Sequence, residues 1–246
     1  MVSLLYPGNT LSEQVLRDAV WALETTLTLS PQQRQHTCLR LDGGFGTDDN
    51  LNWALQRGYQ LSAKHKSGRR AGAWARWVQL WQPLPSGQRW VALAPEQLHF
   101  CVPTRTLLLR WLDTKGKPKH GLFVVTDLHS SLEFVCQSYN LRAGAEIDIR
   151  DDKQGLLLTH RRKRAWHAQA ILVVLNDWAH NFITMFRRIA LTGTPLAHFG
   201  PYRLIQDVFT IPGEVVIRDG QLVELHLLET HPYAHIMAEA LPRLWR

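Results

Sequence analysis

The sequence predicts an α/β fold that carries a β-rich insertion, and three observations lead to this prediction. Residues 11–63 alternate between helical and strand-like stretches. Residues 69–119 are rich in Pro, Gly and Trp, and they alternate apolar with polar side chains. From residue 122 the order of strand and then helix resumes. Strands that alternate with helices are typical of an α/β layer, whereas period-two alternation indicates strands.

The first 63 residues predict four elements, in the order helix, strand, helix and strand, at residues 11–29, 37–41, 48–57 and 59–63. Helical spacing of apolar residues defines the first helix, which ends before Pro31. Thr47 can cap the second helix and Gly58 can end it. Between the first strand and that helix, Asp42-Gly43-Gly44-Phe45 reads as a turn.

The insertion at 69–119 predicts strands at 89–93 and 106–112, with Thr114–Pro118 as a hairpin loop. A strand at 122–126 follows. Ser130 and Glu133 then resemble a capping box. The box opens one long helix that runs through Tyr139 and Glu146, and Gly144 can bend it.

The last third of the chain predicts one long helix, one hairpin and one short helix. The long helix covers residues 165–188 and is strongly apolar. A loop rich in Gly and Pro follows, at 193–201. Residues 214–229 predict a hairpin that turns at Asp219-Gly220, and an amphipathic helix closes the chain.

Composition excludes several classes of protein. Of the 246 residues 45% are hydrophobic and 20% are charged, as in a soluble globular protein with a packed core. No apolar run approaches the roughly 20 residues of a membrane span, and the first ten residues lack the pattern of a signal peptide. The three cysteines show no metal-site spacing and fit a reducing compartment. We therefore expect a cytoplasmic protein without a membrane partner.

The net charge of +7 is unevenly distributed. Between Lys64 and Lys119, eleven Lys and Arg residues face Glu96 and Asp113, a local charge of +9, and residues 156–188 carry +5. Five of the ten tryptophans lie in the first of these stretches. Cations interleaved with aromatic rings suit a nucleic-acid surface. The alternative is that the tryptophans are core residues and the cations keep the protein soluble.

Asp42 stands at the carboxyl end of a predicted buried strand, where α/β proteins build their sites. A carboxylate there can reach a divalent metal, and the glycines that follow let a substrate approach the backbone. The alternative is an Asp that only forms the turn.

Tyr139, Arg142, Glu146 and Lys153 lie at offsets 0, 3, 7 and 14. On one helix these offsets fall within about 60° of each other. An aromatic ring, two cations and a carboxylate would then share a face. The alternative is a solvated face with helical charge pairs.

These residues together resemble the DDE transposases of bacterial insertion sequences, the cut-and-paste kind with a β-rich insertion before the last acid. The family signature around the third acid is Tyr-x2-Arg-x3-Glu-x6-Lys, which Tyr139 to Lys153 matches at all four positions. LRLDGGFG resembles the strand of the second acid, and Pro7-Gly8-Asn9 the segment before the first core helix. Residues 160–188 resemble the helix that follows the glutamate.

The resemblance implies a ribonuclease H-like fold and metal-dependent phosphodiester chemistry on DNA. It makes Asp42 and Glu146 the catalytic acids, which hold Mg²⁺, with Mn²⁺ as a substitute. Residues that would contact DNA are Tyr139, Arg142, Lys153, Arg161, Arg162, Lys163 and Arg164. Relatives stack an aromatic side chain of the insertion on a flipped base, and the candidates here are Trp90 and Trp111.

The resemblance also divides the chain. Residues 1–68 and 120–190 would form the core, 69–119 the insertion, and 191–246 a hairpin and helix that pack on the core. The family's first acid lies upstream of the Pro-Gly-Asn segment, where this chain begins. We therefore expect an incomplete core that lacks its first strands, and a chain that does not cut DNA alone.

Two other readings stay open. A catalytically dead remnant would bind transposon-end DNA, or a full-length transposase, and so inhibit transposition. A relic would have no selected function. An unpaired edge at residues 37–41 also predicts self-association.

Four further groups of polar residues have ordinary explanations. His231 and His235 have zinc-like spacing without a third ligand, and read as surface histidines at a helix start. Asp127 reads as a helix cap, Asp48 and Asp49 as a helix first turn, and Asp151 and Asp152 as a solvated face.

Overall fold

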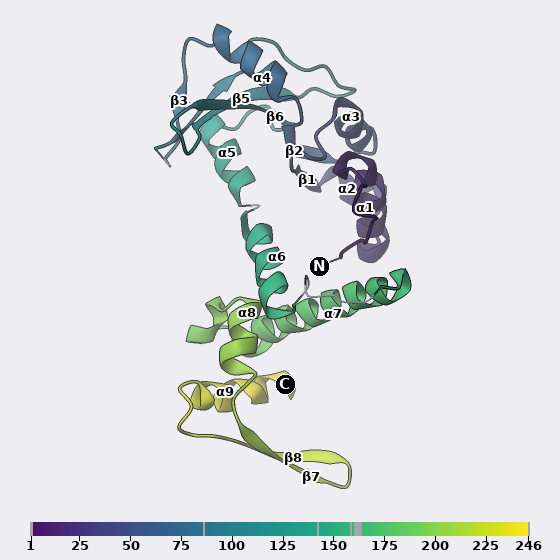
Figure 1. Ribbon diagram of the computed structural model, residues 1–246, viewed down its shortest axis with the longest axis vertical. Coiled ribbons are helices and arrows are strands. Elements are labelled where there is room, and N and C mark those ends of the chain that lie inside the picture. Colours follow the sequence, from purple (N-terminus) through teal and green to yellow (C-terminus); the bar gives the residue numbers. More distant parts are fainter. Residues whose placement is uncertain (1, 86, 142, 158, 160–163, 246) are drawn as a thin grey trace. The chain divides into compact units, whose positions relative to one another are not determined.

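The computed structural model describes residues 2–85, 87–141, 143–157, 159 and 164–245 (Figure 1). Contacts within the chain divide it into two compact units. One, the sheet unit, is Tyr6–Ala143; the other, the C-terminal unit, combines Met1–Leu5 with Gly144–Arg246. None of the helices in the described ranges is long and apolar enough to cross a membrane.

The sheet unit contains one six-stranded sheet with the order β1-β2-β6-β5-β4-β3. Its strands are β1 (Cys38–Leu41), β2 (Gln60–His65), β3 (Gln82–Pro83), β4 (Arg89–Leu93), β5 (Arg105–Leu112) and β6 (Pro118–Val125). Its helices are α1 (Ser12–Leu27), α2 (Pro31–Gln35), α3 (Asp48–Gln56), α4 (Gly68–Trp74), a 3₁₀ turn at Ala75–Trp77 and α5 (Leu132–Asn140). β1 and β2 are parallel, and the other neighbours are antiparallel. The unit is therefore a mixed α/β layer, as the sequence predicts.

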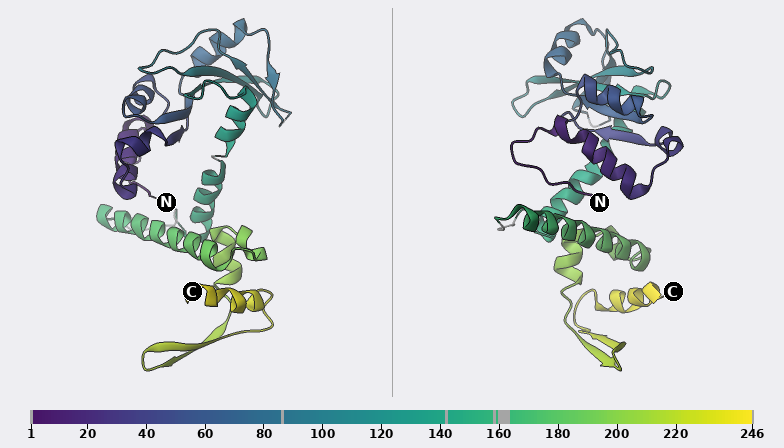
Figure 2. Two further views of the ribbon diagram at one scale, coloured as in Figure 1. Left: turned by 180° about the vertical axis from the view of Figure 1, so that it is seen from behind. Right: turned by 90° about the vertical axis from the view of Figure 1, so that its right-hand side faces the viewer.

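Helices cover both faces of this sheet (Figures 1 and 2). On one face α1 and α3 pack over β1 and β2, in a core that includes Leu39, Leu61 and Val124. On the same face α4 packs over β5 and β6 through Ala71. On the opposite face α5 packs on a core that includes Phe123. Because side chains alternate along β6, consecutive residues of this strand pack into cores on opposite faces of the sheet.

The four elements predicted before residue 63 are confirmed as α1, β1, α3 and β2. The Thr47 hydroxyl accepts a hydrogen bond from the amide of Asn50, as predicted for the N-cap of α3. The short helix α2 was not predicted. Its sequence signal is Ser30 as the N-cap followed by Pro31 at the first helical position.

The insertion is partly β-rich, as predicted, and partly helical. Strands β4 and β5 confirm the predicted runs, and the 114–118 loop joins β5 to β6. The prediction missed α4, whose first turn is capped by the Ser67 hydroxyl. Strands β3 to β5 extend the sheet that contains β1 and β2. The boundaries at 69 and 119 stay a prediction.

The single helix predicted through Tyr139 and Glu146 is wrong. The structure has two helices there, α5 ending at Asn140 and α6 (Ala143–Gly155) beginning after it. Tyr139 and Lys153 therefore do not share one helical face, because Tyr139 lies on α5 and Lys153 on α6. The N-cap of α5 is Ser131, one residue after the predicted Ser130.

The C-terminal unit is mainly helical. Its long helix is α7 (Trp166–Ala190), and its hairpin consists of β7 (Gly213–Arg218) and β8 (Gln221–Leu227). The remaining elements are short: a 3₁₀ turn at Pro195–His198, α8 (Pro201–Arg203), a π turn at Leu204–Val208, α9 (Ala234–Ala240) and a 3₁₀ turn at Leu241–Trp245. α7, the hairpin and α9 confirm their predictions, and the hairpin turns at Asp219-Gly220, both with positive φ. The predicted loop at 193–201 contains short helical turns instead.

Candidate active site

Asp42 directly follows β1 and lies in the turn that leads to α3, with an exposed side chain. The Gly43 amide donates a hydrogen bond to its Oδ1 at 2.7 Å, and the Phe45 amide donates to its backbone carbonyl at 3.0 Å. The turn thus binds one oxygen of the Asp42 side chain and its backbone carbonyl, while the side chain stays exposed.

The far side of this turn is fixed by close backbone packing against β2. The Lys66 amide donates to the carbonyl of Gly46 at 2.8 Å. A Cβ at Gly46 would lie 1.9 Å from the backbone oxygen of Lys64, so no other residue fits there without a backbone shift. The Asn50 side-chain amide donates to the carbonyl of Phe45 at 3.1 Å. The last glycine of GGFG is therefore required by packing.

Tyr139 fixes the near side of the turn. It is 4% exposed, and its hydroxyl donates to the carbonyl of Leu41, the residue before Asp42, at 3.2 Å. Its ring packs edge-on against Phe123, with centroids 4.7 Å apart. The ammonium group of Lys64 lies 5.4 Å from the centroid of the Tyr139 ring. The Tyr139 hydroxyl therefore binds the residue that precedes Asp42, which places two signature features near each other within the sheet unit.

A pocket of about 240 Å³ lies next to Lys64 and Tyr139, which both line it. The cations that line the pocket are Lys64, Arg89 and Arg110, and the aromatic residues are Trp111, Phe123 and Tyr139. Among its described lining residues none is Asp or Glu. Cations around an aromatic floor suit an anionic ligand that also carries a flat ring.

The two tryptophan candidates differ in their surroundings. Trp111 lines the pocket and is 37% exposed. Trp90 is partly buried, and the Arg110 guanidinium lies 4.8 Å from its ring centroid and 4.7 Å from that of Trp81. Arg110 is thus held between two indole rings, and Trp111 is the candidate whose ring borders the pocket.

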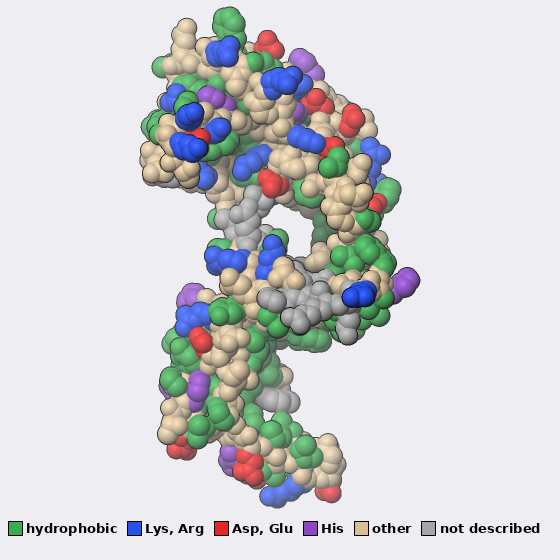
Figure 3. All heavy atoms as spheres, viewed as in Figure 1, with side chains coloured by type: hydrophobic (Ala, Val, Ile, Leu, Met, Phe, Trp, Pro, Cys, Tyr) green, Lys and Arg blue, Asp and Glu red, His purple; other side chains and the backbone are tan. Residues whose placement is uncertain are grey.

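Other predicted site residues are only partly described. Arg142, Arg161, Arg162 and Lys163 lie outside the described residues. Glu146 lies on α6, but its side chain is outside the described part. Lys153 and Arg164 are exposed in the C-terminal unit. Lys and Arg side chains also gather on the side of the sheet unit that holds β3 and β5 (Figure 3). The DNA contacts of these Lys and Arg residues, and the catalytic role of Glu146, stay predictions.

The metal expected from the resemblance can be tested against Asp42. Its exposed carboxylate is a hard oxygen donor of the kind that Mg²⁺ prefers. Within the part of the chain that the structure describes, no group of three or more His, Cys, Asp or Glu could hold a metal ion. Asp42 therefore fits as one ligand, and the described residues do not complete a set.

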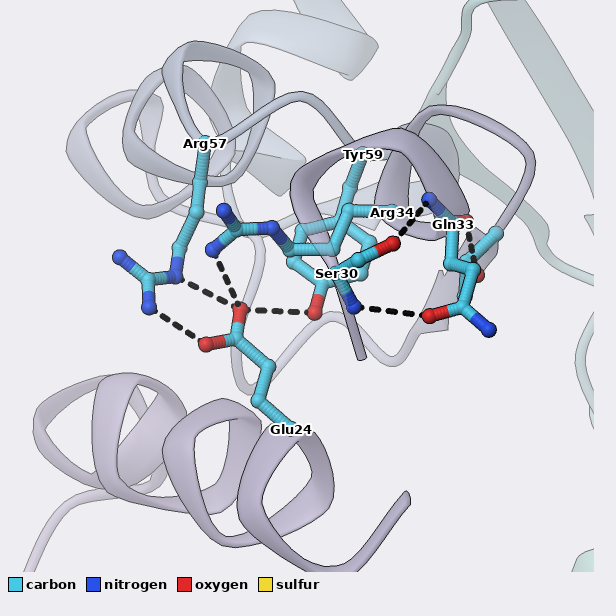
Figure 4. Close-up of polar contacts among 7 residues, drawn as sticks. Glu24, Ser30, Gln33, Arg34, Arg57 and Tyr59 are labelled. Carbon is cyan, nitrogen blue, oxygen red and sulfur yellow. Dashed lines mark hydrogen bonds and ion pairs between the residues drawn. The ribbon is translucent and has the colours of Figure 1, made fainter. Parts of the chain in front are cut away.

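Two polar clusters escaped the sequence prediction. In the first, Glu24 accepts hydrogen bonds from Arg34, Arg57 and Tyr59 (Figure 4). The bonds from Arg57, and then those from Tyr59 and Arg34, lower the Glu24 pKa to about 2 against the opposing effect of burial. Burial, and then the bond to Glu24, raise the pKa of Tyr59. These residues lie far apart in sequence, so no local pattern reveals the cluster.

The second cluster corrects the prediction of a solvated face at Asp151 and Asp152. The Asp152 side chain is fully buried and pairs with His180 Nδ1 at 2.8 Å. Burial raises its pKa, and the His180 bond opposes that effect. Asp127 is a further correction, because it accepts bonds from the amides of His129 and Ser130 and does not cap the helix. Its bonds with Ser130 lower its pKa.

Comparison with known proteins gives one match. The family model described as "Transposase DDE domain group 1" matches residues 103–246, more than half of the chain. No curated protein and no solved structure matches. The matched range includes the whole Tyr139 to Lys153 signature, whereas Asp42 precedes it. The chain belongs to the DDE transposase family.

Proposed function

We propose that this chain is a DNA transposase of the bacterial insertion-sequence type, with a ribonuclease H-like core and duplex DNA at transposon ends as its ligand. The observation that carries the proposal is the bond from Tyr139, which lines a cation-lined pocket, to the residue before Asp42, in a chain of this family. A DNA substrate places the protein with the bacterial nucleoid.

The phosphates of DNA would be neutralised by the cations of the sheet unit. Lys64, Arg89 and Arg110 line the pocket, and the stretch from Lys64 to Lys119 carries a local charge of +9. Such contacts position DNA without reading its sequence. Arg142, Lys153 and residues 161–164 extend this set, as the signature and the basic run imply.

Trp111 is the residue that we propose stacks on an unpaired base. Its ring borders the pocket, and the cations around it can hold the flanking phosphates. Base–aromatic stacking tolerates any base, so the contact suits a flipped nucleotide near a cut site.

Asp42 and Glu146 are the acids that we propose for the reaction. A divalent metal ion held there would activate the attacking oxygen and stabilise the leaving oxygen. The part of Asp42 is to present an oxygen ligand from a rigid turn. Among the described side chains, Asp42 supplies one ligand of such a set.

A second candidate is a chain that binds transposon-end DNA, or a full-length transposase, without cutting. The observation behind it is that the described residues hold no three-residue group of metal ligands. Such a chain would compete with an active transposase for the same ends. It would form mixed oligomers if its partner is the transposase itself.

One experiment separates the two candidates. The purified chain is incubated with transposon-end DNA and Mg²⁺ or Mn²⁺, beside the double variant Asp42→Ala, Glu146→Ala. Nicking clearly above the double variant supports the enzyme. Equal background nicking, with DNA binding retained by both proteins, supports the binding protein. Absence of DNA binding by both would reject the two proposals together.

A further inference from the structure

The family signature implies a phosphate contact for Tyr139, and in this structure the Tyr139 hydroxyl forms a hydrogen bond within the protein. The side chain is buried, and its single hydroxyl proton is directed to a backbone carbonyl of the same unit. A phosphate oxygen needs a donor, and a phenol has one to give. The acceptor is Leu41, which ends β1 and precedes Asp42.

The ring of Tyr139 is held from two sides, so the position of the hydroxyl is well defined. Phe123 of β6 contacts it edge-on, and the Lys64 ammonium of β2 lies over its face. Lys64 and Phe123 are themselves paired across the sheet. The carbonyl of Leu41 is therefore tied to the centre of the sheet through an aromatic side chain, as well as through its own strand.

This tie matters because β1 lies at an edge of the sheet, with β2 as its neighbour among the described strands. Edge strands are held by hydrogen bonds on one side and are the first to fray. The exit of the turn is anchored by Gly46 against β2 and by Asn50 on Phe45. Tyr139 supplies the corresponding anchor at its entry, so Asp42 stands between two fixed points.

We infer that Tyr139 is a positioning residue, which holds the end of β1 and thereby aims the Asp42 carboxylate. Its value to the proposed reaction is then the placement of a carboxylate ligand. The catalytic importance of Asp42 rests on the proposed function, whereas the placement itself does not.

The test replaces Tyr139 with Phe, which keeps the ring contacts and removes the hydroxyl. Tyr59→Phe is the matched control, because Tyr59 is equally buried and its hydroxyl bonds Glu24 in the same unit. The readouts are the carboxyl ¹³C signal of Asp42, the amide signal of Gly43 and the affinity for duplex DNA. We expect Tyr139→Phe to displace or split both signals and Tyr59→Phe to leave both in place. Both variants should keep the DNA affinity within about twofold, because neither removes a cation.

Unchanged Asp42 and Gly43 signals in Tyr139→Phe would overturn the inference. A loss of DNA affinity with unchanged signals would assign Tyr139 to phosphate contact instead. If the parent chain binds no DNA, the proposed function fails while the two NMR signals still decide the placement. Should Tyr139→Phe not fold, 3-fluorotyrosine at position 139 perturbs the same hydroxyl and is judged by the same signals.

Discussion

Two carboxylates of the sheet unit, Glu24 and Asp42, have opposite surroundings. Glu24 is 11% exposed and accepts hydrogen bonds from two guanidinium groups and a phenol. Asp42 is exposed, and its Oδ1 accepts a bond from the amide next in the chain. Glu24 is largely buried among its donors, whereas the side chain of Asp42 is exposed on a turn whose backbone is fixed.

The difference separates a structural site from a candidate functional one. A carboxylate surrounded by donors has little capacity left for a metal or a substrate, and its lowered pKa reports that stabilisation. An exposed carboxylate on a fixed turn, such as Asp42, is accessible to a metal or a substrate. Perturbed pKa values often mark functional sites, but the lowered pKa of Glu24 marks a structural clamp that joins α1 to Arg34, Arg57 and Tyr59.

The largest expected effect is loss of the Glu24 clamp. Glu24→Ala should lower the free energy of unfolding by about 3 kcal/mol, because Arg57 and Arg34 would lose the charge that compensates them. Urea denaturation measures this. Glu96→Ala, at an exposed position, is the control and should stay within about 0.5 kcal/mol of the parent. Equal losses of unfolding free energy in Glu24→Ala and Glu96→Ala would show that the Glu24 hydrogen bonds do not stabilise the fold.

The pH dependence of the unfolding free energy should also show the contribution of the Glu24 carboxylate. The folded-state pKa of Glu24 is about 2, below the ordinary value. Its contribution is therefore complete above about pH 5 and is lost as pH falls toward 2, in total about 3 kcal/mol. Unfolding followed between these pH values should show a steeper loss in the parent than in Glu24→Gln. Parallel curves would contradict the assignment.

Gly46 tests the rigidity of the Asp42 turn. Gly46→Ala would force a Cβ against the backbone of Lys64 and should cost about 1–3 kcal/mol in unfolding free energy. Gly43→Ala is the matched control in the same turn, since a Cβ there meets Lys64 at an ordinary 3.9 Å. If the two alanine variants are equally stable, the turn is not fixed as the structure indicates.

The last expected effect is on binding alone. Trp111→Ala should weaken binding to DNA with an unpaired base by about 1–3 kcal/mol and leave folding intact. Fluorescence anisotropy with duplex and unpaired-base probes measures the difference. Trp77→Ala, at an indole that is 76% exposed and lies outside the pocket lining, should bind like the parent. If Trp77→Ala alone lost affinity for DNA with an unpaired base, Trp111 would not be the stacking residue.

Local patterns predicted most of the fold, because capping residues and apolar periodicity act within a few positions. They failed where tertiary contacts decide. Helix α5 ends at Asn140 and α6 begins at Ala143, so the chain does not continue as one helix up to the glycine at 144 that suggested a bend. The sequence around Asp152 predicts a solvated face, but the Asp152 side chain is buried and pairs with His180 of α7.

The candidate site was predicted in part. The position of Asp42 at a strand end could be predicted, because a strand-like run precedes it and two glycines follow it. The contact between Tyr139 and Leu41 joins residues 98 positions apart. Neither spacing nor composition encodes such a contact, so a motif can name both residues without revealing that they touch.

The most direct test of the proposed function is the affinity for duplex DNA as a function of salt. We predict a fall of orders of magnitude between about 50 and 200 mM salt, because cations of the sheet unit would release counterions from the phosphates. Arg89→Ala with Arg110→Ala should reduce the slope, whereas Asp42→Asn should keep it. Binding that is insensitive to salt, or absent at low salt, would contradict the account.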